Sequence, residues 1–342
     1  MPTGGHNEYL FETMGSEPRL IADGGRARDF RKVSSIFRGA ERTLMNGLLA
    51  EVVATGDTVV RTGRTADDEP RTIAGFPVIG PDNNVAGVRV AADADTAAPV
   101  HHRTTVAYQW ELGIPNGPPR LHMPQQLVDL LEITETHRDR VVFGPLDFFI
   151  RVARTPQLVR MWESIVDAQP GYVDSGTLLM QTGDGQPWAL LYAQRYVTTE
   201  VGPRLRVLCQ DVTDTMDPRE MRREIMDVNL AHAAIESSGQ FGNIWDWRWP
   251  VTCILKWIPG FPPGLGHGAS SGQRPGLHPD DIARMPEIRA RAFAEGHVRE
   301  RVRARRLAGG WMSGTFTWRP IDPEVSKTIG FALVKFDEPD GE

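Results

Sequence analysis

Residues 244–249 read IWDWRW, residues 277–282 read LHPDDI, and residues 309–311 read GGW. If the first segment is a strand, its alternating tryptophans project from one face. The second segment has the composition of a helix start, because proline is tolerated in the first turn and aspartates meet the positive end of the helix dipole. The paired glycines of the third segment indicate a turn. We therefore expect a strand, then a helix, then a hairpin.

Working outward from these segments, the last hundred residues form one predicted unit, over residues 240–338. Apolar and polar residues alternate in its predicted strands, which cover residues 243–250, 251–257, 298–307, 311–319 and 328–335. A helix is expected between the second and third of these strands, within residues 278–295. The pattern predicts five strands, with a helix between the second and the third.

The preceding sequence divides at the proline-rich segment 114–119. After it, helices are expected over residues 125–133, 147–152 and 155–168, followed by strands over 177–182, 188–197 and 204–212. Before it, we expect a helix that begins near Glu41 and ends at Gly56, a hairpin over residues 72–91 and a strand over 101–112. Residues 1–19 are expected to be a flexible tail.

In order and spacing, the three quoted segments resemble the PAS domain, a small sensor module of about five antiparallel strands with short helices between the second and third. Residues 210–214, which read QDVTD, resemble the exit of such a domain into a linker helix. The resemblance implies an α+β chain of tandem PAS/GAF-like modules, each with a five-stranded antiparallel sheet and short helices. The expected modules are residues 20–115, GAF/PAS-like; 120–214, PAS-like; and 240–338, a PAS domain. Whether residues 20–214 form one module or two stays open.

An amphipathic linker helix is expected over residues 217–238. Its apolar positions repeat at steps of four and three, which is the spacing of a coiled-coil seam. The predicted dimer seam consists of Met221, Ile225, Val228, His232 and Ile235. The alternative is that the same stripe packs against its own chain.

The tryptophans of the last unit are candidates for a ligand pocket, because pockets are mostly apolar and aromatic. The candidate residues are Trp245, Trp247, Trp257 and Trp311. The structural alternative is that the row formed by Trp245, Trp247 and Trp249 covers the helices of its own domain.

A second candidate contact is a stripe of arginines on one expected strand, which places their side chains on one sheet face. These residues are Arg299, Arg301, Arg303 and Arg305. They suit an anion or an acidic protein partner, unless they pair with acids of the same sheet or stay hydrated. A metal site at His278, Asp280 and Asp281 is possible by residue type, but helix capping explains all three.

Composition and missing motifs restrict the function. A net charge of −6 argues against nucleic-acid binding, and no apolar run is long enough to cross a bilayer. With two cysteines, a disulfide framework is not implied, which favours the cytoplasm. The excess of arginine over lysine is typical of a GC-rich genome such as that of an actinobacterium. The sequence has no phosphate loop, no catalytic motif and no recognisable output domain.

We therefore predict a cytoplasmic, non-enzymatic sensory or regulatory protein. It would bind a small ligand, a protein partner or both, and it is expected to be a homodimer. The alternatives are a dimeric interaction scaffold without ligand and, less favoured, an enzyme on an α+β cup. No metal is expected, and the sequence supports neither haem nor a flavin as cofactor.

Overall fold

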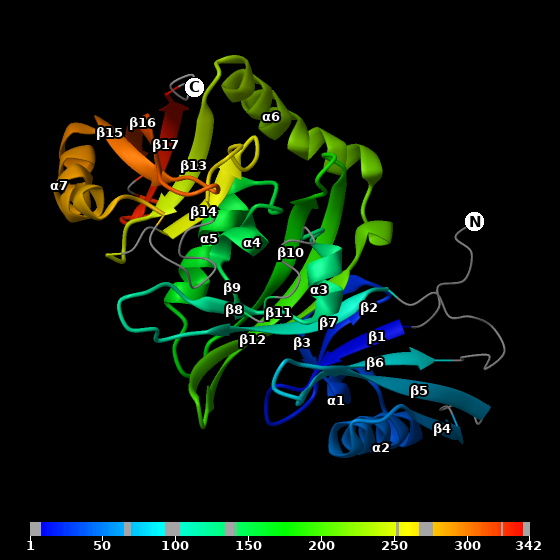
Figure 1. The fold of residues 1–342 in the computed structure, drawn as a ribbon. Helices are drawn as coiled ribbons and strands as arrows, with labels where there is room; N and C mark the ends of the chain where they lie inside the picture. The colour runs from blue at the N-terminus through cyan, green and yellow to red at the C-terminus, as the bar shows by residue number, and fades with distance from the viewer. Residues whose placement is uncertain are drawn as a thin grey trace.

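The computed structural model describes residues 8–64, 70–92, 103–133, 140, 142–250, 253–266, 276–322 and 324–337. It is a mixed α+β fold with three antiparallel sheets, which succeed one another along the chain (Figure 1). The α+β class and the antiparallel pairing agree with the sequence-based prediction. The prediction of five strands is correct for the third sheet, whereas the first and second sheets have six.

The first sheet has the strand order β3-β2-β1-β6-β5-β4. Its strands are β1 (Glu8–Glu12), β2 (Arg19–Asp23), β3 (Arg26–Lys32), β4 (Val59–Arg64), β5 (Pro70–Ile79) and β6 (Val85–Ala92). Helices α1 (Val33–Ile36) and α2 (Gly39–Thr55) follow β3, and α2 buries Met45, Leu48, Leu49 and Val52. Gly56 ends α2 in the left-handed conformation, at φ 72°.

The expected flexible tail is wrong for residues 8–19. Residues 8–12 form β1, which lies in the centre of the first sheet, between β2 and β6. Phe11 and Leu10 on this strand are buried on opposite faces, so β1 belongs to the core. Residues 1–7 lie outside the described part of the chain.

The second sheet has the order β10-β11-β12-β7-β8-β9. Its strands are β7 (Thr105–Glu111), β8 (Arg120–His122), β9 (Val142–Phe143), β10 (Val173–Gln181), β11 (Pro187–Thr199) and β12 (Gly202–Asp211). The intervening helices are α3 (Gln125–Leu130), α4 (Pro145–Phe149) and α5 (Thr155–Val166). The boundary expected at residues 114–119 is therefore misplaced, because β7 precedes it and yet pairs with β8 and β12.

The first and second sheets pack face to face. Their shared apolar cluster includes Leu10 and Ala86 from the first sheet and Leu208 from the second. Gly87 permits this close approach, since a Cβ at that position would lie 2.4 Å from a methyl carbon of Leu208. The first two sheets therefore share one core layer.

The third sheet has the order β14-β13-β17-β16-β15. Its strands are β13 (Phe241–Asp246), β14 (Cys253–Ile258), β15 (Val298–Arg305), β16 (Trp311–Pro320) and β17 (Ile329–Phe336). Helix α7 (Pro279–Glu295) lies between β14 and β15 and covers one face of the sheet with Ile288 and Ala292. Because β13 ends at Asp246, the expected row of three tryptophans is broken: Trp249 packs in the core of the second sheet instead.

Helix α6 (Pro218–Ser237) occupies the range expected for the amphipathic helix and runs from β11 to β13 (Figure 1). Met221 and Ile225 are each 3% exposed and lie in the apolar cluster between the first two sheets. The predicted dimer seam is wrong at these two positions, because their own chain already covers them. Val228, His232 and Ile235 are partly buried.

Polar contacts join the third sheet to the second. Asp246 on β13 accepts a hydrogen bond from Trp162 Nε1 on α5, at 2.7 Å. Just after β13, Arg248 donates to Glu163, also on α5, at 2.5 Å. On β14, Lys256 donates from Nζ to the backbone carbonyl of Val152. We call this set of contacts the joint.

Among the described residues, no helix is both long and apolar enough to span a membrane.

Candidate functional site

The interior of the third sheet, on the face covered by α7, is lined with indoles. Trp245 on β13 lies edge-on to Trp318 on β16, with ring centroids 6.0 Å apart. Phe316 stacks on Trp318 at 5.1 Å, because residues two apart on a strand share a face. Trp245, Trp257 and Trp318 are all at most 2% exposed. These side chains form the centre of the hydrophobic core of the third sheet.

Asn243 is the polar residue at the centre of this aromatic interior. In the sheet register it lies between Trp257 on β14 and Ala332 on β17. Ala332 in turn lies opposite Trp318 on β16. Asn243 is completely buried, and neither its Oδ1 nor its Nδ2 has a hydrogen-bond partner in the described part of the chain.

The indole N–H groups around Asn243 are also unpaired. Within the described residues, no acceptor meets Nε1 of Trp245, Trp257 or Trp318, nor that of Trp247 nearby. An unpaired buried polar group costs roughly 1–3 kcal/mol. Unpaired polar groups that gather in one buried interior call for an explanation.

The chemistry of these groups defines what they can bind. Each indole N–H only donates, whereas the Asn243 amide both donates and accepts. A ligand for these groups would need acceptor oxygens or ring nitrogens for the indoles, and a donor or an acceptor for the amide. Its faces would pack against the surrounding aromatic rings. We call Asn243, Trp245, Trp257 and Trp318 the indole–amide site.

The predicted pocket residues divide between two places. Trp245 and Trp257 belong to the indole–amide site, and Trp247 lies in the same apolar cluster, against Phe293 of α7. Trp311 lies elsewhere: it is partly exposed and packs between His278 and Arg305.

Sequence reasoning missed Asn243 and Trp318. A polar residue that alternates with Phe241 and Trp245 on an apolar strand was the available signal for Asn243. For Trp318, the signal was its alternation with Phe316.

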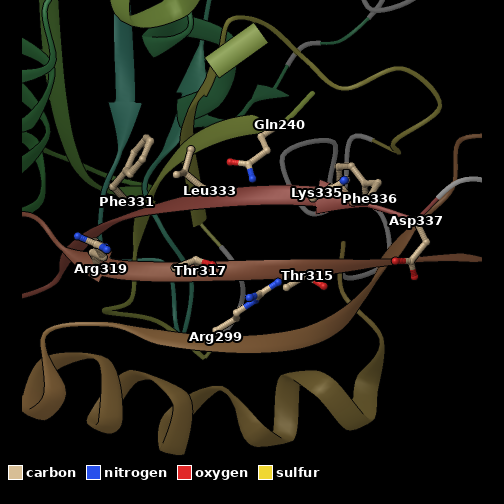
Figure 2. A pocket seen from close by; sticks show the side chains of 10 residues that line it. All are labelled: Gln240, Arg299, Thr315, Thr317, Arg319, Phe331, Leu333, Lys335, Phe336 and Asp337. Atoms are coloured by element: carbon tan, nitrogen blue, oxygen red, sulfur yellow. The ribbon is translucent and has the colours of Figure 1, made fainter. Parts of the chain in front are cut away.

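The opposite face of the third sheet carries an open groove of about 830 Å³ (Figure 2). Polar and charged side chains from β15, β16 and β17 project into it, with apolar side chains along β17. The lining residues are Gln240, Arg299, Thr315, Thr317, Arg319, Phe331, Leu333, Lys335, Phe336 and Asp337. We call this the basic groove. It includes one member of the predicted arginine stripe, Arg299.

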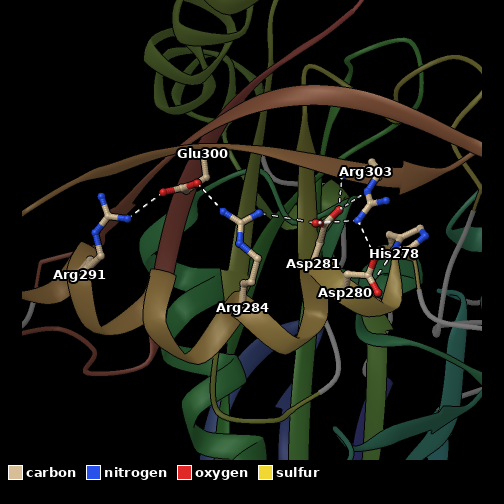
Figure 3. A network of polar contacts seen from close by, with 7 residues as sticks. All are labelled: His278, Asp280, Asp281, Arg284, Arg291, Glu300 and Arg303. Atoms are coloured by element: carbon tan, nitrogen blue, oxygen red, sulfur yellow. Dashed lines mark hydrogen bonds and ion pairs between the residues drawn. The ribbon is translucent and has the colours of Figure 1, made fainter.

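The other members of the stripe have partners within the chain. Arg303 reaches over the sheet edge to Asp280 and Asp281 at the start of α7, at 3.1 and 3.0 Å (Figure 3). Arg301 pairs with Asp337 at 2.6 Å. Arg305 lies 4.5 Å over the ring of Trp311. These three arginines therefore all have partners within the chain.

The region considered for a metal is a helix start joined to an ion-pair network. His278 Nδ1 accepts a hydrogen bond from the backbone N–H of Asp280, at 3.3 Å, which caps α7. Burial raises the pKa of Asp281, but hydrogen bonds from Arg303 outweigh this, and the net shift is downward. In the described ranges, no group of three or more histidines, cysteines and acids is arranged to hold a metal ion.

Lys256 of the joint and His232, which senses its charge, both have lowered pKa values. Burial lowers the pKa of Lys256 to about 8. His232 on α6 has its pKa lowered to about 4, by burial and by the charge of Lys256. Both shifts disfavour additional positive charge at the joint.

The comparisons with known proteins support the fold. Residues 9–100 match the model of the family described as Rv3651-like, N-terminal. The crystal structure of an uncharacterised protein from Mycobacterium tuberculosis is similar over 98% of this chain and 97% of that one, with 18% identity and a TM-score of 0.68. It therefore shares the whole arrangement of sheets. No curated protein matches the sequence.

Two light-oxygen-voltage proteins were also found, at low similarity. An RNA-binding receptor of this kind covers 67% of the chain and 94% of its own length, with 11% identity and a TM-score of 0.24. A light-oxygen-voltage domain studied with a flavin analogue covers 34% of the chain and 89% of its own length, with 17% identity and a TM-score of 0.25. Scores this low carry no structural argument.

Proposed function

We propose that this protein is a non-enzymatic sensory or regulatory protein whose third sheet binds a small ligand at the indole–amide site. The observation that carries the proposal is the set of unpaired polar groups around Asn243. A ligand that supplied their hydrogen bonds would remove a large free-energy penalty.

The proposed modules correspond to the three sheets, each with its own helices. One described helix, α7, lies between the second and third strands of the third sheet, where the PAS domains that its sequence resembles have short helices. In the second sheet, α3, α4 and α5 occupy a similar position, before β10. The first sheet has α1 and α2 between its third and fourth strands. We therefore propose three PAS/GAF-like modules, with α6 connecting the second to the third.

The chemistry of the indole–amide site favours binding over catalysis. General acid–base catalysis needs groups that exchange protons near neutral pH. The indole–amide site consists of indoles and an amide, which do not titrate in that range. The site can hold and orient a bound molecule. A change in the third sheet on binding would then reach the second sheet through the joint or through α6. We propose a cytoplasmic location for this activity.

The first test of this proposal is ligand-dependent thermal stabilisation. The purified protein is screened against planar molecules rich in acceptors, such as aromatic carboxylates, quinones and heteroaromatic amides, and native mass spectrometry checks for a co-purified compound. A ligand at one hundred times its Kd should add about 2.7 kcal/mol of stability.

The matched variants are Asn243→Leu, which should abolish stabilisation by any hit, and Trp311→Ala, which should not. If hits stabilise the native and Asn243→Leu proteins equally, they bind elsewhere and the proposed site is wrong. If no compound binds and none co-purifies, the sensory proposal loses its support.

A further inference from the structure

The basic groove lies on the face of the third sheet opposite the indole–amide site, so a partner can bind in it whether or not that site holds a ligand. Its cations come from three adjacent strands: Arg299 on β15, Arg319 on β16 and Lys335 on β17. In the sheet register, Arg299 lies opposite Thr317, in the middle of the groove. Lys335 lies opposite Thr315 and Arg319 lies opposite Phe331, at the two ends.

These three cations have no ion pair with any residue that the structure describes. The carboxylate in the groove, that of Asp337, is neutralised by Arg301 at 2.6 Å. All three cations are exposed. The groove therefore presents uncompensated positive charge in a chain whose net charge is −6.

The spacing of the charges restricts the partner. Thr315 and Arg319 are four residues apart on one strand, and Lys335 lies beside Thr315. At about 3.4 Å per residue, the backbone positions of the two end cations are roughly 14 Å apart. An elongated partner with several negative charges can contact both ends while their side chains stay extended along the groove.

An apolar strip on β17 runs from the Arg319 end of the groove toward Lys335. Leu333 and Phe331 follow one another on the groove face of β17, and both are partly exposed. Thr315 and Thr317 add hydroxyl groups beside them. A partner that fits would thus have apolar side chains between acidic ones, and its hydrogen bonds would come from backbone or carboxylate groups.

We propose that the basic groove binds an acidic segment of a partner protein, in which carboxylates alternate with apolar side chains. The carboxylates contact Arg299, Arg319 and Lys335, and an apolar side chain packs on Leu333 and Phe331. Charge complementarity of this kind raises the association rate and selects the partner.

The experiment is a fluorescence anisotropy titration of the full chain with a short labelled peptide in which glutamates alternate with leucines. We expect saturable binding that weakens as salt rises, because exposed ion pairs are screened. Replacing one cation, in Arg319→Ala, should weaken binding about threefold. The double reversal Arg299→Glu with Arg319→Glu should weaken it by more than about tenfold.

The matched control reverses two exposed arginines on β3, Arg26→Glu with Arg31→Glu. It changes the net charge equally, far along the chain from the groove, and should leave peptide binding within about twofold. A second variant, Leu333→Ser, should also weaken binding, while a peptide with lysine in place of glutamate should not bind. Thermal unfolding verifies that each variant is folded.

Several results would overturn the proposal. One is no saturable binding of the acidic peptide to the native protein. Another is equal loss in the β3 control, which would indicate a general charge effect. If inorganic phosphate binds and the peptide does not, the groove is a small-anion site. If sedimentation shows a dimer that the double reversal dissociates, the occupant is a second copy of the chain.

Discussion

The interiors of the second and third sheets are both rich in buried aromatic rings, but they differ in how their polar atoms are hydrogen-bonded. In the second, Trp110 stacks on Phe149 at 6.0 Å and meets Trp162 edge-on at 6.2 Å. Trp162 uses its N–H group in the joint, where it donates to Asp246. In the third, Asn243 and the indoles around it are equally buried, yet their polar atoms are unpaired.

The second interior also has unpaired groups, which include an indole N–H and an amide oxygen. Tyr108 Oη and Trp110 Nε1 lack partners within the described chain. Burial raises the pKa of Tyr108 well above its ordinary value, so this phenol stays neutral. Gln194, a buried amide of the second sheet, has acceptors on Ser164, Tyr172 and Asp174 within hydrogen-bond distance of its Nε2, whereas its Oε1 is unpaired within the described chain. We propose that the third interior is the one that binds a ligand, because both polar atoms of Asn243 are unpaired there, whereas the amide nitrogen of Gln194 has partners.

The largest effect is expected in the second interior, from Trp162→Ala. It removes a fully buried ring, at a cost of about 3–5 kcal/mol, and leaves the Asp246 carboxylate without its indole donor. Urea denaturation followed by circular dichroism measures the loss. Trp162→Phe, which keeps most of the ring, should cost less. A loss below about 1 kcal/mol for Trp162→Ala would contradict this expectation.

The second prediction concerns Lys256, which lies between the two interiors. Burial lowers its pKa to about 8, so between pH 8 and its ordinary value the unfolded chain binds a proton that the folded protein has released. The free energy of unfolding should therefore rise with pH over this window, by roughly 3 kcal/mol. Below the window, the full cost of burying the charged ammonium group remains.

Lys256→Met should abolish this pH dependence, measured by urea titrations at several pH values. Lys335→Met, which removes an exposed lysine, is the control and should keep it. If Lys256→Met retains the slope, the ammonium group is hydrated in the folded protein and the joint is not as dry as its burial indicates.

The third prediction compares two buried amides, Asn243 and Gln194, whose replacement should change the stability in opposite directions. Asn243→Leu removes polar atoms that have no partner, and should stabilise the ligand-free protein by about 1 kcal/mol. Gln194→Leu removes a bonded amide and should destabilise by about 1–3 kcal/mol. Thermal and urea unfolding of both variants give the comparison. If Asn243→Leu also destabilises by more than 1 kcal/mol, Asn243 is satisfied within the protein.

Local sequence patterns predicted those parts of the fold that depend on neighbouring residues. The range expected for the amphipathic helix agrees with α6, and the hairpin glycines precede β16 as expected. Long-range pairing was not predictable, because nothing in residues 105–111 indicates that they pair with β12. The strand β3, RARDFRK, was missed because an exposed edge strand needs no apolar alternation.

The same distinction applies to the indole–amide site. Trp245 and Trp257 were candidates because large aromatic side chains line pockets, and their role in ligand binding stays a prediction. Asn243 could not be identified, since its importance lies in the absence of partners within the described structure, which only the surrounding strands determine. Met221 shows a different limit: the stripe allowed either a partner helix or packing within the chain, and the chain's own sheets cover it.

The smallest effect is expected for Trp311→Ala. Trp311 is partly exposed, and its contacts are His278 at 4.8 Å and Arg305 at 4.5 Å. An exposed cation–π contact contributes about 0.5–1 kcal/mol, so the loss of stability should not exceed about 1 kcal/mol. Ligand stabilisation should persist in Trp311→Ala and disappear in Trp245→Ala. If both variants lose it, the binding region extends from Asn243 to the β15–β16 turn, and the four-tryptophan pocket expected from the sequence is the better description.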